Sequence, residues 1–304
     1  MTPKNQICLY GHENVFQELV DLYNNNKLPS KILLSGQKGI GKCTLTYHLI
    51  NCILSKNEEH QYDFKNKKIN EDNKSFKLIQ NSSNPNLILI DVLPEKKMID
   101  ISQIRKLIEN LNKSSFNSKP RFVLIDNIEF LNINSINALL KVLEEPNLNI
   151  FFFLINNNKR IIPTLISRCL NYKLYLTHDQ SIDISNKIIL TNIYELINKE
   201  LLDYYFTPGK IYNLIKFSKE NNIELDKLSL KDFLSLIIDK LYYSKNNSMD
   251  YMIYDFIELF LRTKISLKNS ELFTYFLRRI DNTKKFNLDR ESLFIEFKMK
   301  ILNA

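Results

Sequence analysis

A glycine-rich segment near the N-terminus constrains the fold of this chain more than any other feature. Residues 36–44 read Gly-Gln-Lys-Gly-Ile-Gly-Lys-Cys-Thr, with an apolar run at 32–34 before them and apolar residues at helical spacing after Lys42. Glycines allow successive backbone N–H groups to converge on phosphate oxygens, and the lysine adds a positive charge. The pattern predicts a phosphate-binding loop between a buried strand and a helix. The predicted contact residues are Gly36, Gly39, Gly41, Lys42, Cys43 and Thr44.

One position of this loop departs from the pattern. Cys43 stands where loops of this kind carry a serine or threonine, whose hydroxyl binds Mg²⁺. The loop therefore keeps the groups that hold phosphate and lacks the group that holds the metal. The alternative interpretation is a glycine-rich turn that binds no ligand. The complete spacing and the flanking strand and helix favour the phosphate-binding loop.

A second segment predicts another part of the same site. Residues 122–125 are an unbroken apolar run that ends at Asp126, as in a central parallel strand with an acid at its carboxyl end. In ATPases with such loops the aspartate holds the Mg²⁺ shell, and the next residue is usually a glutamate that orients the attacking water. Here the next residue is Asn127, and an amide does not take up a proton at neutral pH. Glu129 is predicted to point to the other face of a continuing strand.

Strand patterns alternate with helical patterns over the first part of the chain. The predicted strands are residues 32–34, 87–90, 122–125, 151–155 and 172–176. A predicted helix at 101–111 begins with Asp100 and Gln103 in capping-box spacing. Such alternation is typical of a doubly wound α/β domain with a parallel sheet, which we predict for residues 1–176.

The segment after Asp126 predicts an amphipathic helix. Apolar residues recur at positions 136, 139, 140 and 143, Asn134 or Ser135 is placed to cap the start, and Pro146 follows the end. Residues 137–146 read Asn-Ala-Leu-Leu-Lys-Val-Leu-Glu-Glu-Pro, and Ser-Arg-Cys occupies 167–169. Together these two segments closely resemble the clamp-loader branch of the AAA+ ATPases.

Three shorter segments narrow the resemblance. Gly11-His12-Glu13, Leu28-Pro29 and residues 286–289 are similar to the delta-prime type of clamp-loader subunit rather than the gamma/tau motor type. The resemblance implies a P-loop AAA+ domain, then a small helical lid at 177–222 and an all-helical collar at 223–304 that joins five subunits in a ring. The aromatic residues of the last part follow helical periodicity, which favours core and subunit packing over stacking on single-stranded nucleic acid.

The resemblance also assigns roles to individual residues. Arg168 would reach across a subunit boundary to the terminal phosphate of a neighbour's ATP, as an arginine finger. Asn156, or Asn157 one residue later, falls where the family has a polar sensor of that phosphate. Gly209 or Lys210 takes the place of a second sensor arginine, and lysine lacks the planar fork of arginine.

Charge and cysteine content bear on partners and location. The 304 residues carry a net charge of +8, which suits a protein that works beside DNA; a solvated lysine-rich surface is the alternative, because the basic residues are scattered. No secretory signal or membrane-length apolar run is present, so we expect a cytoplasmic protein without membrane contact. The four cysteines are isolated, so we expect no zinc site. The polar stretch 56–85, where several clamp-loader subunits carry a zinc module, is expected to be a flexible insertion without its own core.

Together with the resemblance, these features lead to one main functional hypothesis. The chain would be a clamp-loader subunit of the DNA polymerase III holoenzyme that binds ATP, if at all, without turnover and donates Arg168 to a neighbouring ATPase. Its partners would be the delta and gamma/tau subunits in a hetero-pentameric ring and, through that ring, the sliding clamp and primer-template DNA. One alternative is an active gamma/tau-type ATPase in which Thr44 or water replaces the missing ligand. A free-standing DNA-binding adaptor is another, and no groove-reading motif supports it.

Overall fold

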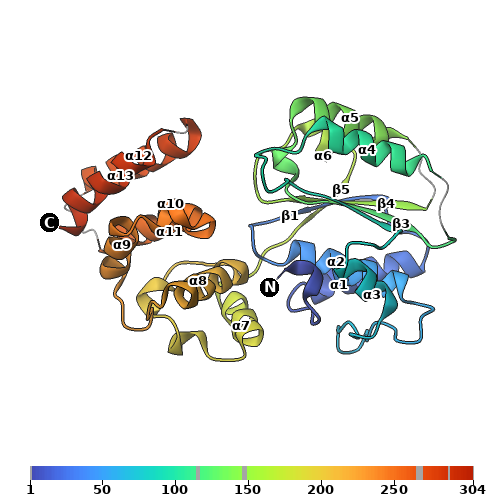
Figure 1. The fold of residues 1–304 in the computed structure, drawn as a ribbon, viewed down its shortest axis with the longest axis horizontal. Helices are drawn as coiled ribbons and strands as arrows, with labels where there is room; N and C mark the ends of the chain where they lie inside the picture. Colours follow the sequence, from blue (N-terminus) through green and yellow to red (C-terminus); the bar gives the residue numbers. More distant parts are fainter. Residues whose placement is uncertain (1, 114–116, 146–148, 265–269, 287, 304) are drawn as a thin grey trace. The chain divides into compact units, whose positions relative to one another are not determined.

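The computed structural model of the chain describes residues 2–113, 117–145, 149–264, 270–286 and 288–303. The chain divides into two compact units, Met1–Thr177 and His178–Ala304. Figure 1 shows the sheet of the first unit and the helices of the second. Pro146 and Asn287, which belong to the sequence patterns above, lie outside the described residues. The division of the second unit into a lid and a collar at residue 222 stays a prediction.

Five parallel strands form the centre of the first unit. They are β1 Lys31–Ser35, β2 Leu87–Ile90, β3 Arg121–Ile125, β4 Ile150–Asn156 and β5 Leu170–Lys173. Their order across the sheet is β2-β3-β4-β1-β5, and every neighbouring pair is parallel. β1 lies inside the sheet, between β4 and β5. The helices that connect successive strands must therefore lie on both faces of the sheet. The predicted doubly wound α/β fold with a parallel sheet is confirmed.

Helices cover both faces of this sheet, as Figure 1 shows. On one face lie α1 Glu13–Asn24, α2 Lys42–Leu54 and α3 Lys74–Gln80; on the other lie α4 Ile101–Leu111, α5 Ile133–Glu144 and α6 Pro163–Ile166. Two short 3₁₀ helices complete the described elements, η1 Pro3–Asn5 and η2 Ile128–Phe130. One core packs α4 and α5 onto the strands through fully buried side chains such as Leu33, Val123, Leu139, Leu143 and Leu154.

Two sequence predictions coincide with the structure to the residue. β2 and α4 have the predicted bounds, and the Gln103 side chain accepts a hydrogen bond from the Asp100 backbone N–H at 3.1 Å, as a capping box requires. The cap of α5 was predicted wrongly. Asn132, not Asn134 or Ser135, caps that helix, since its side chain accepts from the Ser135 backbone N–H. The helix begins at Ile133, which is 73% exposed and therefore falls outside the apolar stripe that defined the prediction.

The fifth strand is shifted toward the N-terminus of the predicted range 172–176. β5 pairs with β1 from Leu170 to Lys173, and Leu174 then donates its backbone N–H to Ser35 at 2.7 Å. The prediction was wrong because Leu174 and Leu176 are buried although they lie beyond the strand. Their apolar alternation reflects burial of a connecting segment and not pairing in the sheet.

The polar stretch 56–85 is packed, contrary to the expectation of a flexible insertion. It contains α3, and its apolar side chains are buried at Tyr62, Ile69, Phe76 and Ile79. The hydroxyl of Tyr62 lies 3.0 Å from Nδ1 of the buried His48 on α2. The stretch therefore shares the core of the first unit instead of standing apart from it.

A group of buried hydrogen bonds, here called the Asn73 cluster, fastens this stretch to α2. Asn73 is 0% exposed, and its Nδ2 donates to the His60 backbone oxygen at 2.6 Å. Its Oδ1 accepts from Asn51 Nδ2 at 3.1 Å and from the Phe76 backbone N–H at 2.7 Å, which caps α3. Asn73, a polar residue of this stretch, is thus paired inside the protein.

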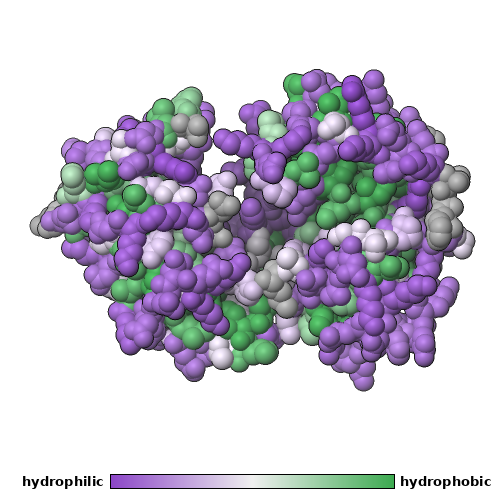
Figure 2. All heavy atoms as spheres, viewed as in Figure 1, coloured by the Kyte–Doolittle hydropathy of each residue, from purple (hydrophilic) through white to green (hydrophobic). Residues whose placement is uncertain are grey.

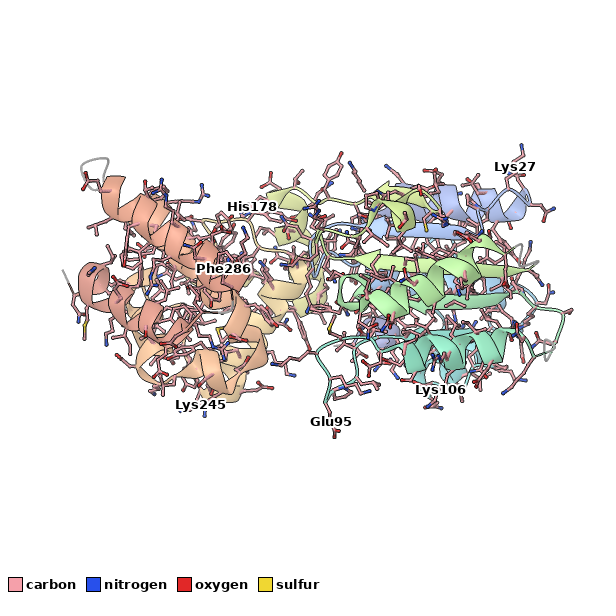
Figure 3. The ribbon with its side chains drawn as sticks, turned by 90° about the horizontal axis from the view of Figure 1, so that it is seen from above. Lys27, Glu95, Lys106, His178, Lys245 and Phe286 are labelled. Atoms are coloured by element: carbon pink, nitrogen blue, oxygen red, sulfur yellow. The ribbon has the colours of Figure 1, made fainter. Side chains whose placement is uncertain are left out.

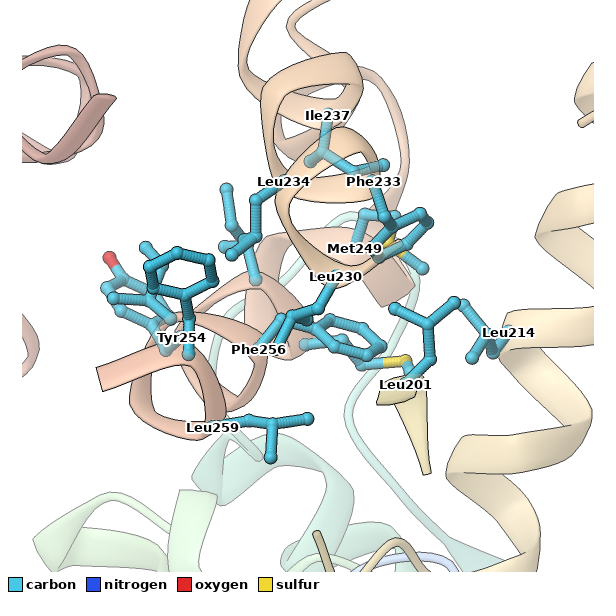
Figure 4. Close-up of a cluster of buried hydrophobic side chains, with 14 of the residues drawn as sticks. Leu201, Leu214, Leu230, Phe233, Leu234, Ile237, Met249, Tyr254, Phe256 and Leu259 are labelled. Atoms are coloured by element: carbon cyan, nitrogen blue, oxygen red, sulfur yellow. The ribbon is translucent and has the colours of Figure 1, made fainter. Parts of the chain in front are cut away.

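Helices make up the second unit. They are α7 His178–Ile189, η3 Ile193–Glu195, η4 Lys199–Leu201, α8 Pro208–Asn221, α9 Leu230–Asp239, α10 Tyr242–Lys245, α11 Asn247–Lys264, α12 Ser270–Phe286, α13 Arg290–Phe297 and the π-helical η6 Lys298–Leu302. One core joins them, and Figure 4 shows part of it around Phe256, whose ring centroid lies 4.8 Å from that of Phe233. Core packing is confirmed for Tyr243, Tyr254, Phe256, Phe260 and Phe276, which are buried; Tyr251 is 69% exposed.

Both units have exposed charged side chains. Lys27, Lys106 and Lys245, from three different parts of the chain, are exposed and labelled in Figure 3. Figure 2 shows hydrophilic side chains over most of the visible face of each unit. No helix of the described residues is long and apolar enough to cross a bilayer.

Candidate functional site

The glycine-rich loop between β1 and α2 has a backbone that requires glycine. A Cβ atom at Gly36 would lie 2.5 Å from Ile40 Cδ1 and 2.5 Å from the backbone oxygen of Leu174. Gly39 and Gly41 have φ angles of +90° and +97°, which L side chains rarely adopt. Gly41 is the N-cap of α2, so the loop leads directly into the unpaired N–H groups at the start of that helix.

Lys42 lies inside this loop. Lys42 is only 3% exposed, and its Nζ donates to the backbone oxygens of Gly36 at 2.8 Å and Gln37 at 2.7 Å. Burial lowers the pKa of Lys42 to about 8, and the charges of Asp126 and Glu129 act in the opposite direction. An ammonium group has three donors, so one remains for an anion. The loop therefore fits a phosphate group in backbone geometry and in charge.

The position next to Lys42 does not supply a magnesium ligand. Burial, and then the charge of Asp126, raise the pKa of Cys43 well above its usual value, so the thiol is neutral and donates to that carboxylate. Burial and the charge of Asp91 raise the pKa of Asp126 to about 6. Mg²⁺ prefers hard oxygen ligands, and a neutral thiol is not one. Thr44, the next residue of α2, carries a hydroxyl and is half-buried.

Asn127 connects the carboxyl ends of three strands. Its Nδ2 donates to Asp91 Oδ1 after β2 at 2.7 Å, and its Oδ1 accepts from Asn157 Nδ2 after β4 at 2.8 Å. Asn127 itself follows β3, in left-handed backbone with a φ of 55°. An amide makes both contacts because it is donor and acceptor, whereas a carboxylate only accepts. Asn127 therefore links its neighbours and has no capacity to act as a base.

Glu129 belongs to the same network, which the sequence analysis predicted wrongly. β3 ends at Ile125, and η2 turns the chain instead of continuing the strand. Glu129 Oε1 accepts from Asn157 Nδ2 at 2.9 Å, and its charge contributes to the pKa of Lys42. The prediction assumed strand alternation, which the left-handed backbone of Asn127 interrupts.

Asn156 and Asn157 make different contacts. Asn156 is 6% exposed, and its side chain closes a turn, with Nδ2 at 3.0 Å from the Lys159 backbone oxygen. Asn157 is the residue that reaches Asn127 and Glu129. Of the two alternatives for the phosphate sensor, the geometry favours Asn157, and the sensor role of either residue stays a prediction.

Replacing Asn127 with glutamate is expected to destabilise the protein by about 2 to 3 kcal/mol and not to create turnover. The change removes the donor to Asp91, adds a charge near Asp91 and Glu129, and places a larger side chain in left-handed backbone. Urea unfolding of the full chain measures the loss. Asn127→Gly keeps the backbone without the added charge and should lose less. A glutamate variant as stable as the native chain would contradict this account.

Arg168 lies at the edge of the sheet, between α6 and β5. Its Nε donates to Glu144 Oε1 at 3.1 Å, its Nη2 donates to the same oxygen, and its Nη1 donates to the Thr164 backbone oxygen at 2.7 Å. The side chain is 32% exposed. The neighbouring Cys169 packs against the core, and burial raises the pKa of its thiol to about 11.

Lys210, in the first turn of α8 after Gly209, is engaged within the second unit. Its Nζ lies 2.6 Å from Asp255 Oδ2 and 5.8 Å from the centroid of the Phe206 ring. The Lys210 ammonium group is therefore paired with Asp255. Across the described parts of both units, no group of three or more His, Cys, Asp or Glu side chains is arranged to hold a metal ion.

The family of the chain follows from comparison with known proteins. The sequence pattern of one family, described as DNA polymerase III, delta subunit, matches residues 11–177, more than half of the chain. The chain belongs to this family. The match includes the phosphate-binding loop, Asp126 and Arg168, and it confirms the resemblance to clamp-loader AAA+ proteins at the level of the family.

Individual relatives of the family include both types of subunit. The gamma/tau subunit of DNA polymerase III from Mycoplasma genitalium is 28% identical over 231 residues, which are 75% of this chain and 34% of that protein. The delta' subunit from Buchnera aphidicola subsp. Acyrthosiphon pisum is 25% identical over 282 residues, 88% of this chain and 84% of that protein. The chain thus spans only about a third of the gamma/tau relative. A gamma subunit-related protein from Thermotoga maritima superposes with a TM-score of 0.48 at 16% identity, over 94% of this chain and 97% of that chain.

Three residues of the site in this family member were missed from the sequence. Asp91 directly follows the apolar run of β2, as Asp126 follows β3, so the same signal was available for both. Glu129 required knowledge of the turn after β3. His12, in left-handed backbone before α1, donates from Nε2 to the Ile40 backbone oxygen at 2.9 Å and so supports the phosphate-binding loop. No local pattern indicates that contact, which joins segments 28 residues apart.

Proposed function

We propose that this chain is a delta-prime-type clamp-loader subunit that does not hydrolyse ATP and donates Arg168 to the ATP site of a neighbouring subunit. One observation carries the proposal: the site keeps a complete phosphate-binding loop while Cys43 and Asn127 replace the metal-binding hydroxyl and the base. Both replacements are built into hydrogen bonds with Asp126, Asp91 and Asn157. Arg168, the residue proposed to act on the phosphate of another subunit, is present.

The proposed absence of turnover is supported by the chemistry of the site. Hydrolysis requires a positioned metal on the β- and γ-phosphates and a group that orients water. Cys43 is a protonated thiol hydrogen-bonded to Asp126, and Asn127 uses both ends of its amide to hold two strands together. Neither residue is available for those tasks. ATP bound by the loop would stabilise the first unit without being consumed.

Nucleotide affinity is expected to fall about tenfold between pH 7 and pH 9, because the protonated fraction of a lysine with a pKa of about 8 falls by that order. Only the ammonium form of Lys42 offsets phosphate charge. Titration of the full chain with a fluorescent ATP analogue at both pH values measures the effect. In Lys42→Met, affinity should be low and independent of pH. Equal affinity of the native chain at both pH values would show that Lys42 does not contact the nucleotide.

The proposed partners are the delta and gamma/tau subunits in a hetero-pentameric ring, with the sliding clamp and primer-template DNA contacted through that ring. Relatives named as DNA polymerase III subunits support a multi-subunit assembly. The net charge of +8 is compatible with a place near DNA.

Reconstitution with one component omitted tests this function. The cognate delta and gamma/tau subunits are assayed for ATP turnover and clamp loading on primed DNA, with and without this chain, and the chain is assayed alone. We expect no turnover by the isolated chain and a strong dependence of the assembly on its presence. Clamp loading of equal rate without this chain would refute the proposal.

A second candidate, an active ATPase of gamma/tau type, is favoured by one observation. Glu129 lies in the site and contributes to the charge around Lys42, so it offers a carboxylate that the sequence alone did not place there. In this case the isolated chain hydrolyses ATP, and Glu129→Gln abolishes the activity. Turnover that is absent in the isolated native chain excludes this candidate.

A further inference from the structure

The guanidinium of Arg168 is held by two neighbouring elements of the first unit. Glu144 is the last residue of α5, and Thr164 lies in α6. Both helices are fixed by buried side chains, Leu143 at 0% exposure and Leu165 at 1%. The contacts on Arg168 therefore come from packed elements rather than from a free loop.

These contacts use only part of the guanidinium. Arginine has five N–H donors in one plane. Three of them donate here, from Nε and Nη2 to Glu144 and from Nη1 to the Thr164 backbone oxygen. Among the described contacts, one N–H group on each terminal nitrogen remains, and such groups donate to phosphate oxygens. Glu144 therefore orients Arg168 and leaves a donor on each terminal nitrogen for a phosphate.

The position of Glu144 in its helix is unusual on electrostatic grounds. A carboxylate in the last turn of a helix faces the negative end of the helix dipole, where a cation is preferred. Arg168 supplies that cation, and Glu144 is more than half exposed, with a side chain at 55%. An ion pair as exposed as this one contributes little to the stability of the protein. Its main effect is therefore to orient Arg168.

We propose that Glu144 is a positioning residue, which holds the guanidinium of Arg168 so that its two remaining N–H groups face the terminal phosphate of a nucleoside triphosphate in the adjacent subunit. The inference rests on the proposed function, since it concerns the same arginine. An arginine side chain that is oriented before contact loses less freedom in the transition state. A carboxylate that instead competed with the phosphate for Arg168 would slow turnover, and its removal would accelerate it.

A double-mutant cycle in the reconstituted complex tests this role. Native chain, Glu144→Gln, Arg168→Ala and the double variant are compared by kcat and KM for ATP and by assembly of the complex. We expect Glu144→Gln to lower kcat roughly tenfold, as displacement of a catalytic group does, with unchanged KM and assembly. In the Arg168→Ala background Glu144→Gln should have no further effect. Glu109→Gln, an exposed carboxylate on α4, is the control and should leave kcat unchanged.

The outcomes separate this inference from the function on which it rests. If Arg168→Ala lowers kcat and Glu144→Gln leaves it unchanged or raises it, the positioning role is refuted and the arginine finger stands. If Arg168→Ala leaves kcat unchanged, the proposed function itself fails. If Glu144→Gln lowers kcat equally in both backgrounds, Glu144 does not act through Arg168, and the inference is refuted.

Discussion

Replacing Arg168 with alanine is expected to lower the clamp- and DNA-stimulated ATP turnover of the reconstituted complex by roughly 10³-fold. The guanidinium would stabilise charge that develops on the phosphoryl group held by the neighbouring subunit, and alanine offers nothing in its place. The Arg168 side chain is 32% exposed, and its described hydrogen bonds go to Glu144 and the Thr164 backbone. Its loss should therefore leave the fold of the chain intact.

Steady-state ATP hydrolysis with clamp and primed DNA measures the effect, and size-exclusion chromatography checks that the complex still assembles. Arg168→Lys should recover little of the turnover, because lysine lacks the planar pair of donors. Arg105→Ala, which removes an exposed arginine on α4, controls for a loss of surface charge. Full turnover of an assembled Arg168→Ala complex would show that this chain contributes no group to the neighbour's chemistry.

Replacing Asn73 with alanine is expected to destabilise the first unit by about 3 to 5 kcal/mol. The change leaves three partners without Asn73: the His60 backbone oxygen, Asn51 Nδ2 and the Phe76 backbone N–H. Asn73 is fully buried, so water does not replace the lost contacts. The N-cap of α3 is lost with them.

Chemical unfolding followed by circular dichroism measures this change, with Asn81→Ala as the matched control. Asn81 follows α3 and is exposed, so its replacement should change stability by less than about 0.5 kcal/mol. Limited proteolysis gives an independent readout, because residues 56–73 should become cleavable in the Asn73 variant. If the two variants are equally stable, the Asn73 cluster does not hold this stretch in place.

Much of the fold was predictable because it depends on local signals. The apolar run that forms β2 and the Asp100–Gln103 capping box each specify an element within a few residues. The phosphate-binding loop is equally local, since its glycines are required by φ angles and a close approach within one turn. These features are specified by residues close together in the sequence and do not depend on contacts with distant segments.

The remaining features depend on contacts between distant segments. Residues 56–85 read as polar and flexible, yet Asn73 is buried because Asn51, 22 residues away, and the His60 backbone meet it. Glu129 turns into the site because Asn127 leaves the strand conformation for left-handed backbone. Asparagine permits that conformation but does not require it. The choice between Asn156 and Asn157 depends on the turn to Lys159. A sequence pattern in one segment does not show which distant residue will contact that segment and fix its conformation.

The bridge that Asn127 forms between Asp91 and Asn157 limits which residues position 127 can accept. A carboxylate that returns to position 127 would meet an existing acid at Asp91, lose a donor and occupy left-handed backbone. Under the proposed function, hydrolysis would therefore need coordinated substitutions at several positions, including Cys43. The side chains around position 127 thus favour an amide over a carboxylate, and they set which residue types this position accepts.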